Sequence, residues 1–126
     1  MRLAHRFESG MAQTGWEEVV VAWLTLLGAG LLEIVWAFAV SQSKGFTRLW
    51  PTVATVIAIS ASVGLLSWSA RSLPIGTAYT VWTGIGSVGT FAVGIIFLGE
   101  PAHPSRVIAA TLIVGGLLLM KASTPA

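Results

Sequence analysis

Glu33 is an acidic residue inside a long apolar stretch, and its carboxylate is the group in this chain best placed for chemistry. The stretch covers 19–40 and contains no lysine or arginine that could neutralise the charge. Because about 20 apolar residues suffice to cross a hydrocarbon core of roughly 30 Å, the stretch predicts a transmembrane helix. A carboxylate near its centre costs about 2.5 to 3.5 kcal/mol, so its presence indicates a functional site.

Three small residues and one tryptophan are the neighbours of Glu33 on its face of the helix. Ala29, Gly30, Trp36 and Ala37 lie three or four residues away and therefore share its face. We expect the carboxylate to look into a space left open by small residues, with one tryptophan beside it. A glutamate near a helix end could instead reach the interface, but 14 residues of the stretch precede Glu33 and seven follow it.

The composition is that of a membrane protein. Of 126 residues, 55% are hydrophobic and 10% are charged, and the mean hydropathy is +0.83. The absence of cysteine excludes disulfides, thiolate metal sites and cysteine nucleophiles. The net charge of +2 comes from scattered basic residues, without the clustered basic face that a nucleic-acid partner requires.

The sequence does not predict an enzyme. It shows no catalytic triad and no Gly-rich phosphate loop, so we expect energy from an ion gradient and no cofactor. His103 lies between two prolines without neighbouring ligands, so we expect no metal site.

Four apolar segments predict an all-α membrane protein with four transmembrane helices at about 19–40, 51–70, 77–98 and 105–120. Together they form a predicted transporter domain over 19–123, after a polar N-terminal extension over 1–18. Met11 is an alternative start, which would make the first ten residues a disordered tail or an artefact.

Small residues follow patterns in the second and third helices. Thr55, Ser62 and Ser69 recur every seven residues and place hydroxyls along one stripe of the second helix. The third helix is rich in glycine, and Gly84 and Gly86 form a packing notch, a flexible point where the helix bends, or both.

Four spans place both termini on one side of the membrane. That side then holds four Lys or Arg residues and the other side three, which is almost no bias. Insertion in both orientations is therefore plausible and would permit an antiparallel dimer. Four short helices are too few to shield an acid from lipid. We therefore predict an obligate homodimer with two Glu33 residues facing a common centre.

Three long motifs resemble the small multidrug resistance family and, within it, the guanidinium exporters. They are Leu32-Glu-Ile-Val-Trp-Ala-Phe-Ala39, Gly45-Phe-Thr-Arg-Leu-Trp-Pro51 and Leu73-Pro-Ile-Gly-Thr-Ala-Tyr-Thr-Val-Trp-Thr-Gly-Ile-Gly86. The likeness covers about 20–123. Trp36 and Lys121 match the guanidinium exporters rather than the drug exporters, although Lys121 taken alone is better explained as a headgroup anchor.

The resemblance implies a proton-coupled antiporter that exports guanidinium and small substituted guanidinium cations by alternating access. It also implies a dual-topology antiparallel homodimer in the bacterial inner membrane, where substrate and protons compete for the paired Glu33. The family's substrate- and proton-binding positions map onto Glu33, Trp36, Ser62, Tyr79 and Trp82. The last four would line the site and hold the carboxylates by hydrogen bonds.

Other interpretations of these residues stay open. Tyr79 and Trp82 would also fit an aromatic belt at the membrane interface, and Ser62 alone would be a routine hydrogen bond between helices. By the resemblance, Gly84 and Gly86 form the conformational hinge, letting the third helix kink differently in the two subunits.

The main alternative function is proton-coupled export of quaternary ammonium or aromatic drug cations through the same site. A passive channel and a non-transporting accessory membrane protein are further alternatives. A mid-membrane acid is a natural proton carrier and disfavours the channel. The expected partners are a small cation, protons, membrane lipids and a second copy of the chain.

Overall fold

The computed structural model describes residues 2–124 and, within them, four helices and no strand. The helices are α1 (Arg2–Gln42), α2 (Leu49–Ser69), α3 (Ile75–Leu98) and α4 (Pro104–Ser123). Each contains a span long and apolar enough to cross a membrane, and the span of α1 covers Gly15–Gln42. The prediction of an all-α membrane protein with four transmembrane helices is therefore confirmed.

The start of α1 differs most from the predicted bounds. The helix begins at Arg2 rather than near residue 19, so the polar extension continues the first transmembrane helix. No proline interrupts this part of the sequence, and a helix propagates at little cost once it is nucleated. The other ends lie within three residues of the predicted ones.

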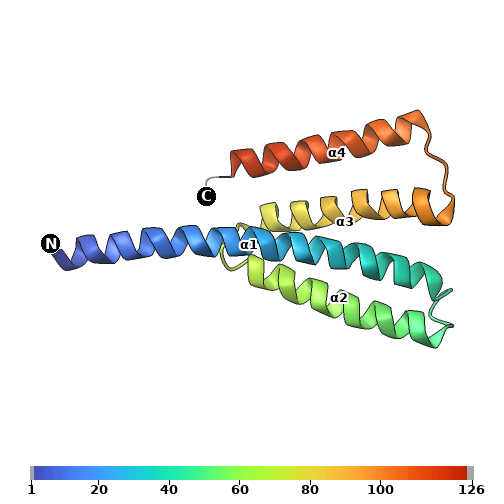
Figure 1. The fold of residues 1–126 in the computed structure, drawn as a ribbon, viewed down its shortest axis with the longest axis horizontal. Helices are drawn as coiled ribbons and strands as arrows, with labels where there is room; N and C mark the ends of the chain where they lie inside the picture. The colour runs from blue at the N-terminus through green and yellow to red at the C-terminus, as the bar shows by residue number, and fades with distance from the viewer. Residues whose placement is uncertain (1, 125–126) are drawn as a thin grey trace.

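The helices run back and forth, with α1 in the middle of the bundle (Figure 1). The α1–α2 and α3–α4 connections lie at one end, and both termini lie at the other with the α2–α3 turn. α1 packs most extensively against α2 and next against α3, whereas α4 packs mainly against α3. Both termini are thus on one side, as an even number of spans predicts.

Backbone conformation explains where two helices end. Gly99 has a φ of 66°, in the left-handed region that glycine adopts without strain, and it ends α3. After α1, Lys44, Gly45 and Phe46 all have positive φ. The hydroxyl of Ser43 stabilises this tight turn by accepting a hydrogen bond from the Phe46 N–H at 3.1 Å.

The hydroxyl stripe of α2 is the buried face of that helix. Thr55, Ser62 and Ser69 are all buried, together with Ala58 and Leu66 between them. A spacing of seven residues keeps one seam of a helix facing its neighbour over two turns. The prediction that the three hydroxyl residues share one face is confirmed.

The contact between α1 and α3 is built on glycines. A Cβ at Gly30 would lie 2.6 Å from Cγ2 of Ile85, and one at Gly89 would overlap the end of the Ile34 side chain. Each isoleucine thus enters a gap left by a glycine on the other helix. These gaps let the two backbones approach closely.

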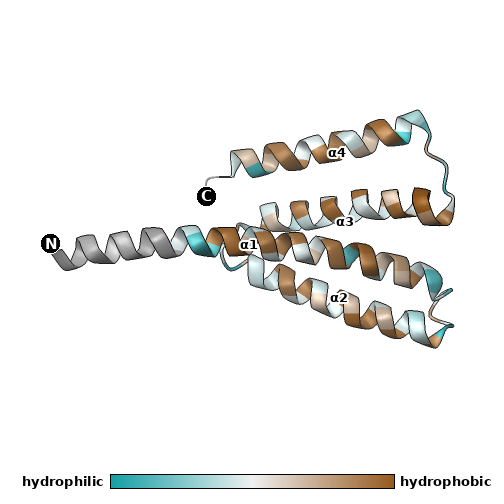
Figure 2. Cartoon of the chain, viewed as in Figure 1, coloured by the Kyte–Doolittle hydropathy of each residue, from teal (hydrophilic) through white to brown (hydrophobic). Residues whose placement is uncertain are grey.

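Much of the apolar surface faces outward. No residue of α4 is buried, and Ile108, Leu112 and Leu119 are 60% to 71% exposed. Figure 2 shows hydrophobic residues along all four helices and hydrophilic residues gathered toward their ends. This distribution suits helices surrounded by lipid.

Replacing Gly30 by alanine is expected to lower the free energy of unfolding by about 1 to 3 kcal/mol, because the added methyl group would press on Cβ of Ile85. Gly64→Ala is the matched control, since a Cβ at Gly64 meets nothing within 4 Å. Thermal unfolding in mild detergent measures both variants. Equal melting temperatures would contradict the close contact between α1 and α3.

Candidate functional site

Glu33 lies within the membrane span of α1 and packs against α3. A Cβ at Gly86 would fall 2.8 Å from Cγ of Glu33 and closer still to its carboxyl group. The acid thus occupies a third glycine gap in the contact that Gly30 and Gly89 also form. A residue larger than glycine at position 86 would displace the carboxylate.

Two polar atoms at this place have no hydrogen-bond partner in the described part of the chain. They are Oε2 of Glu33 and Nε1 of Trp36, and both are buried. Trp36 follows Glu33 by three residues and lies on the same side of α1. An isolated buried charge is costly, so this carboxylate is suited to being neutralised by a proton or a cation. The predicted hydrogen bond from Trp36 to the carboxylate is not formed among the described residues.

A chain of hydrogen bonds joins α3, α2 and α1 one helical turn before Glu33. The indole N–H of Trp82 donates to the Ser62 hydroxyl at 2.9 Å, and this hydroxyl donates to the Ala29 carbonyl at 2.7 Å. Ser62 is fully buried and Trp82 is half-buried. The structure thus brings Ser62 and Trp82 together. Trp82 donates to Ser62 and Ser62 donates to Ala29, so neither of these hydrogen bonds goes to Glu33.

Tyr79 lies beside Trp82 on α3. Their ring centroids are 5.5 Å apart and the ring planes are inclined by 57°, an arrangement that aromatic pairs favour. Tyr79 is 55% exposed. That exposure suits both predicted roles, contact with a ligand and a place in an interfacial aromatic belt.

α3 passes through Gly84 and Gly86 as an unbroken helix. A Cβ at Gly84 would press on Leu117 of α4, just as one at Gly86 would press on Glu33. Both glycines are therefore points of close packing in this conformation. Their role as a hinge stays a prediction.

A cleft of about 250 Å³ lies between α1 and α3, with Arg106 of α4 also lining it, and Glu33 is not among its lining residues. Ala37 lies one turn beyond Glu33, and Ser87 is adjacent to Gly86. Other lining residues lead toward the α3–α4 connection, among them Thr90, Glu100 and Arg106. The lining thus runs from Ala37, one turn beyond Glu33, to one end of the bundle.

Lys121 lies at the other end, near the C-terminus of α4. Its Nζ is 5.2 Å from the ring centroid of Trp23. A cation–π contact at an exposed site contributes about 0.5 to 1 kcal/mol. The contact ties the end of α4 to α1, and the role of Lys121 as a headgroup anchor stays a prediction.

Two features of the site are absent from the sequence prediction. The Ala29 carbonyl accepts the Ser62 hydroxyl, and Gly86 forms the wall against which Glu33 packs. The small side chains of Ala29 and Gly86 were the feature of the sequence that could have indicated close contacts there. Their partners depend on the register between helices, which a single sequence does not reveal.

Four membrane spans and an unpaired acid between two of them define a small transporter-like membrane protein. Residues 21–113 match the family described as Small Multidrug Resistance protein. The chain belongs to this family, as its motifs predict. It is accordingly a multi-pass protein of the bacterial inner membrane.

Relatives in three bacteria carry the name guanidinium exporter. They come from Citrobacter freundii, Salmonella typhimurium and Escherichia coli (strain K12). Each is 51% identical to this chain over 104 residues, which make up 82% of this chain and 99% of the relative. The predicted likeness to the guanidinium-exporting branch is confirmed.

Ser62→Ala would leave the Trp82 indole N–H without its acceptor, so we expect the free energy of unfolding to fall by about 1 to 2 kcal/mol. Ser60→Ala is the control, because Ser60 is exposed and donates to the Val56 carbonyl of its own helix. Thermal unfolding in mild detergent compares them. A Ser62→Ala variant as stable as Ser60→Ala would show that the hydrogen-bonded chain does not stabilise the bundle.

Proposed function

We propose that this protein is a proton-coupled antiporter that exports guanidinium and small substituted guanidinium cations by alternating access. The observation that carries the proposal is the buried, unpartnered Oε2 of Glu33 within a transmembrane span. The names of relatives that are 51% identical over 99% of their own length support the choice of substrate.

Guanidinium matches the chemistry of Glu33. The ion is planar and presents its N–H donors as a fork, which a carboxylate can accept through two parallel hydrogen bonds. Its positive charge neutralises the acid as a proton does. Because each occupant removes the charge that the other needs, protons and guanidinium compete, and this competition couples their movements.

Aromatic residues complete the proposed binding site. Trp36 offers an unpartnered indole N–H beside the carboxylate, and its ring face can attract a cation. Tyr79 and Trp82 supply further aromatic wall, and Ser62 fixes Trp82 through its hydrogen bond at 2.9 Å. In this proposal Ser62 holds the Trp82 ring in position and does not itself contact the substrate.

The proposed working unit is an antiparallel homodimer in which two Glu33 residues share one site. Within a single subunit Glu33 is only half-buried, so four helices leave the acid partly open. A second copy would close the wall around it. The near balance of Lys and Arg between the two sides, four against three, supports insertion in both orientations.

Alternating access requires the site to open to each side in turn. The cleft from Ala37 and Ser87 toward Glu100 supplies a route to one end of the bundle. The proposed movement is a bend of α3 at Gly84 and Gly86, which would alter the packing on Leu117 and on Glu33 together.

Glu33→Gln is expected to abolish guanidinium transport and the opposing proton movement together, because glutamine cannot carry the charge that both need. Purified protein in liposomes is exposed to a guanidinium pulse while currents and internal pH are recorded. Glu17→Gln is the control, since Glu17 is an exposed acid outside both the proposed binding site and the cleft. Coupled transport retained by Glu33→Gln would contradict the proposal. A wild type that responds to quaternary ammonium ions and not to guanidinium would contradict the substrate.

Guanidinium affinity is expected to fall as the pH falls, because protons occupy the carboxylates that the cation needs. Where Glu33 is mostly protonated, the Kd for guanidinium should rise about tenfold for each unit by which the pH falls, for each proton displaced. At high pH the Kd should become constant. Calorimetric titration at a series of pH values measures this. A Kd independent of pH would contradict competition.

A further inference from the structure

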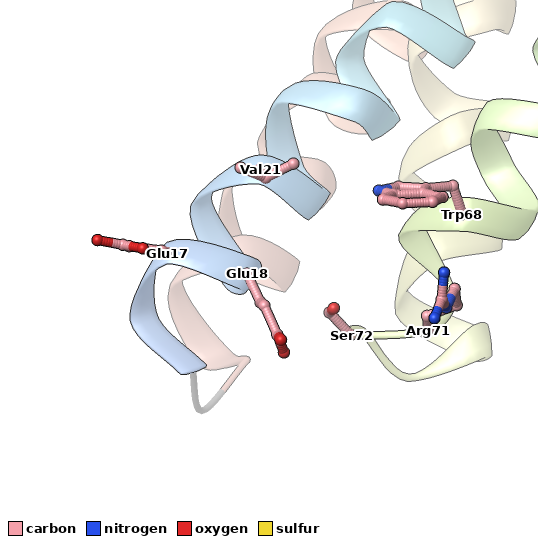
Figure 3. Close-up of a pocket in the computed structure, with 6 residues that line it drawn as sticks. All are labelled: Glu17, Glu18, Val21, Trp68, Arg71 and Ser72. Carbon is pink, nitrogen blue, oxygen red and sulfur yellow. The ribbon is translucent and has the colours of Figure 1, made fainter. Parts of the chain in front are cut away.

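A second pocket lies about four turns from the transport site, at the end of the bundle that holds both termini. It has a volume of about 470 Å³, within the usual range of roughly 300 to 1,000 Å³ for ligand pockets. Its lining comes from α1, from the end of α2 and from the α2–α3 turn (Figure 3), and comprises Glu17, Glu18, Val21, Trp68, Arg71 and Ser72. Glu18 and Glu33 are separated by roughly 22 Å along α1, so the two sites are distinct.

Opposite charges line the two sides of this pocket without pairing. Glu18 points across the opening toward Ser72, with Arg71 beyond it, whereas Glu17 stands at the outer edge (Figure 3). The guanidinium carbon of Arg71 lies over the Trp68 ring, 4.9 Å from its centroid, in a cation–π contact. The N–H donors of this guanidinium can bind an anion. The pocket therefore offers separate places for a cation and an anion.

The pocket lies where the membrane meets water. Val21 belongs to the apolar span of α1, whereas Arg71 and Ser72 lie in the turn after α2. Trp68 is 54% exposed, as a tryptophan at headgroup level commonly is. A ligand here would have its apolar part beside Val21 and Trp68 and its polar part among the charged side chains.

We propose that this pocket binds the headgroup of a zwitterionic phospholipid that carries a primary ammonium, as phosphatidylethanolamine does. The phosphate accepts hydrogen bonds from Arg71 and Ser72, and the ammonium donates to Glu18. A free guanidinium ion would satisfy the acids and leave Arg71 unmatched. An anionic headgroup would satisfy Arg71 and be repelled by Glu17 and Glu18.

The acidic side of this pocket comes from the N-terminal extension of α1. Glu17 and Glu18 precede residues 21–113, the part of the chain that matches the family. The two acids of the headgroup site thus lie outside the family match, whereas Val21 and the side formed by Trp68, Arg71 and Ser72 lie within it. The headgroup site does not depend on the transport proposal, because none of its residues lies in the Glu33 site.

Native mass spectrometry of the full-length protein tests the proposal. The purified protein is mixed in mild detergent with phosphatidylethanolamine, phosphatidylcholine or phosphatidylglycerol of the same acyl chains. We expect phosphatidylethanolamine to bind about tenfold more tightly than the others, since they lack either the ammonium N–H donors or the ammonium itself. Glu18→Gln and Arg71→Gln should each weaken it about tenfold.

Charge-matched controls keep the result specific to the pocket. Glu100→Gln and Arg48→Gln change one charge each at the other end of the bundle and should leave the preference unchanged. Equal binding of the three lipids would overturn the proposal. So would a preference for phosphatidylglycerol that depends on Arg71 and not on Glu18, because it would indicate a simple anion site.

Two further outcomes would replace the lipid by another partner. Guanidinium binding that persists in Glu33→Gln and disappears on adding Glu18→Gln would make the pocket a second substrate site. A direct ion pair between Glu18 and Arg71 would give a different result. The single changes Glu18→Arg and Arg71→Glu would each lower the melting temperature, and the double change would restore it to the same extent in every lipid. The lipid proposal predicts neither result.

Discussion

The cost of holding a carboxylate inside the membrane is the constraint on which this structure depends. Glu33 sits within an apolar span, packs on Gly86 and has an oxygen without a hydrogen-bond partner among the described residues. An ionised group in this place needs a counter-charge, and a neutral one needs a proton. In the proposed exchange, a proton or a cation would each relieve this cost, and an empty site would bear it.

Other buried side-chain polar groups of the described residues have hydrogen-bond partners, and this contrast sets Glu33 and Trp36 apart. In α2 the Thr55 hydroxyl donates to the Pro51 carbonyl at 2.7 Å, and the Ser69 hydroxyl donates to the Leu66 carbonyl at 2.8 Å. Such bonds to the preceding turn let hydroxyl residues enter an apolar helix. In the part of the chain that the structure describes, the buried side-chain atoms left without a partner belong to Glu33 and Trp36. These two residues lie one turn apart, where a ligand or a second subunit could pair with them.

Hydropathy and spacing were enough to predict the four spans, the place of Glu33 inside one of them and the shared face of Thr55, Ser62 and Ser69. These features follow from one helix at a time, so a single sequence contains them. The bond from Ser62 to Ala29 and the contact of Glu33 with Gly86 depend on how two helices are offset along each other. A polar composition also suggested that the first helix starts near residue 19, whereas nothing in the extension stops the helix that begins at Arg2.

Proton release on substrate binding tests the shared site most directly. Purified protein in weakly buffered detergent solution, at a pH where the guanidinium Kd still changes with pH, is mixed with guanidinium, and the pH is followed with an indicator dye. If protons and guanidinium compete for Glu33, the wild type releases protons as guanidinium binds, and Glu33→Gln releases none. Guanidinium binding to the wild type without proton release would contradict exchange at this carboxylate.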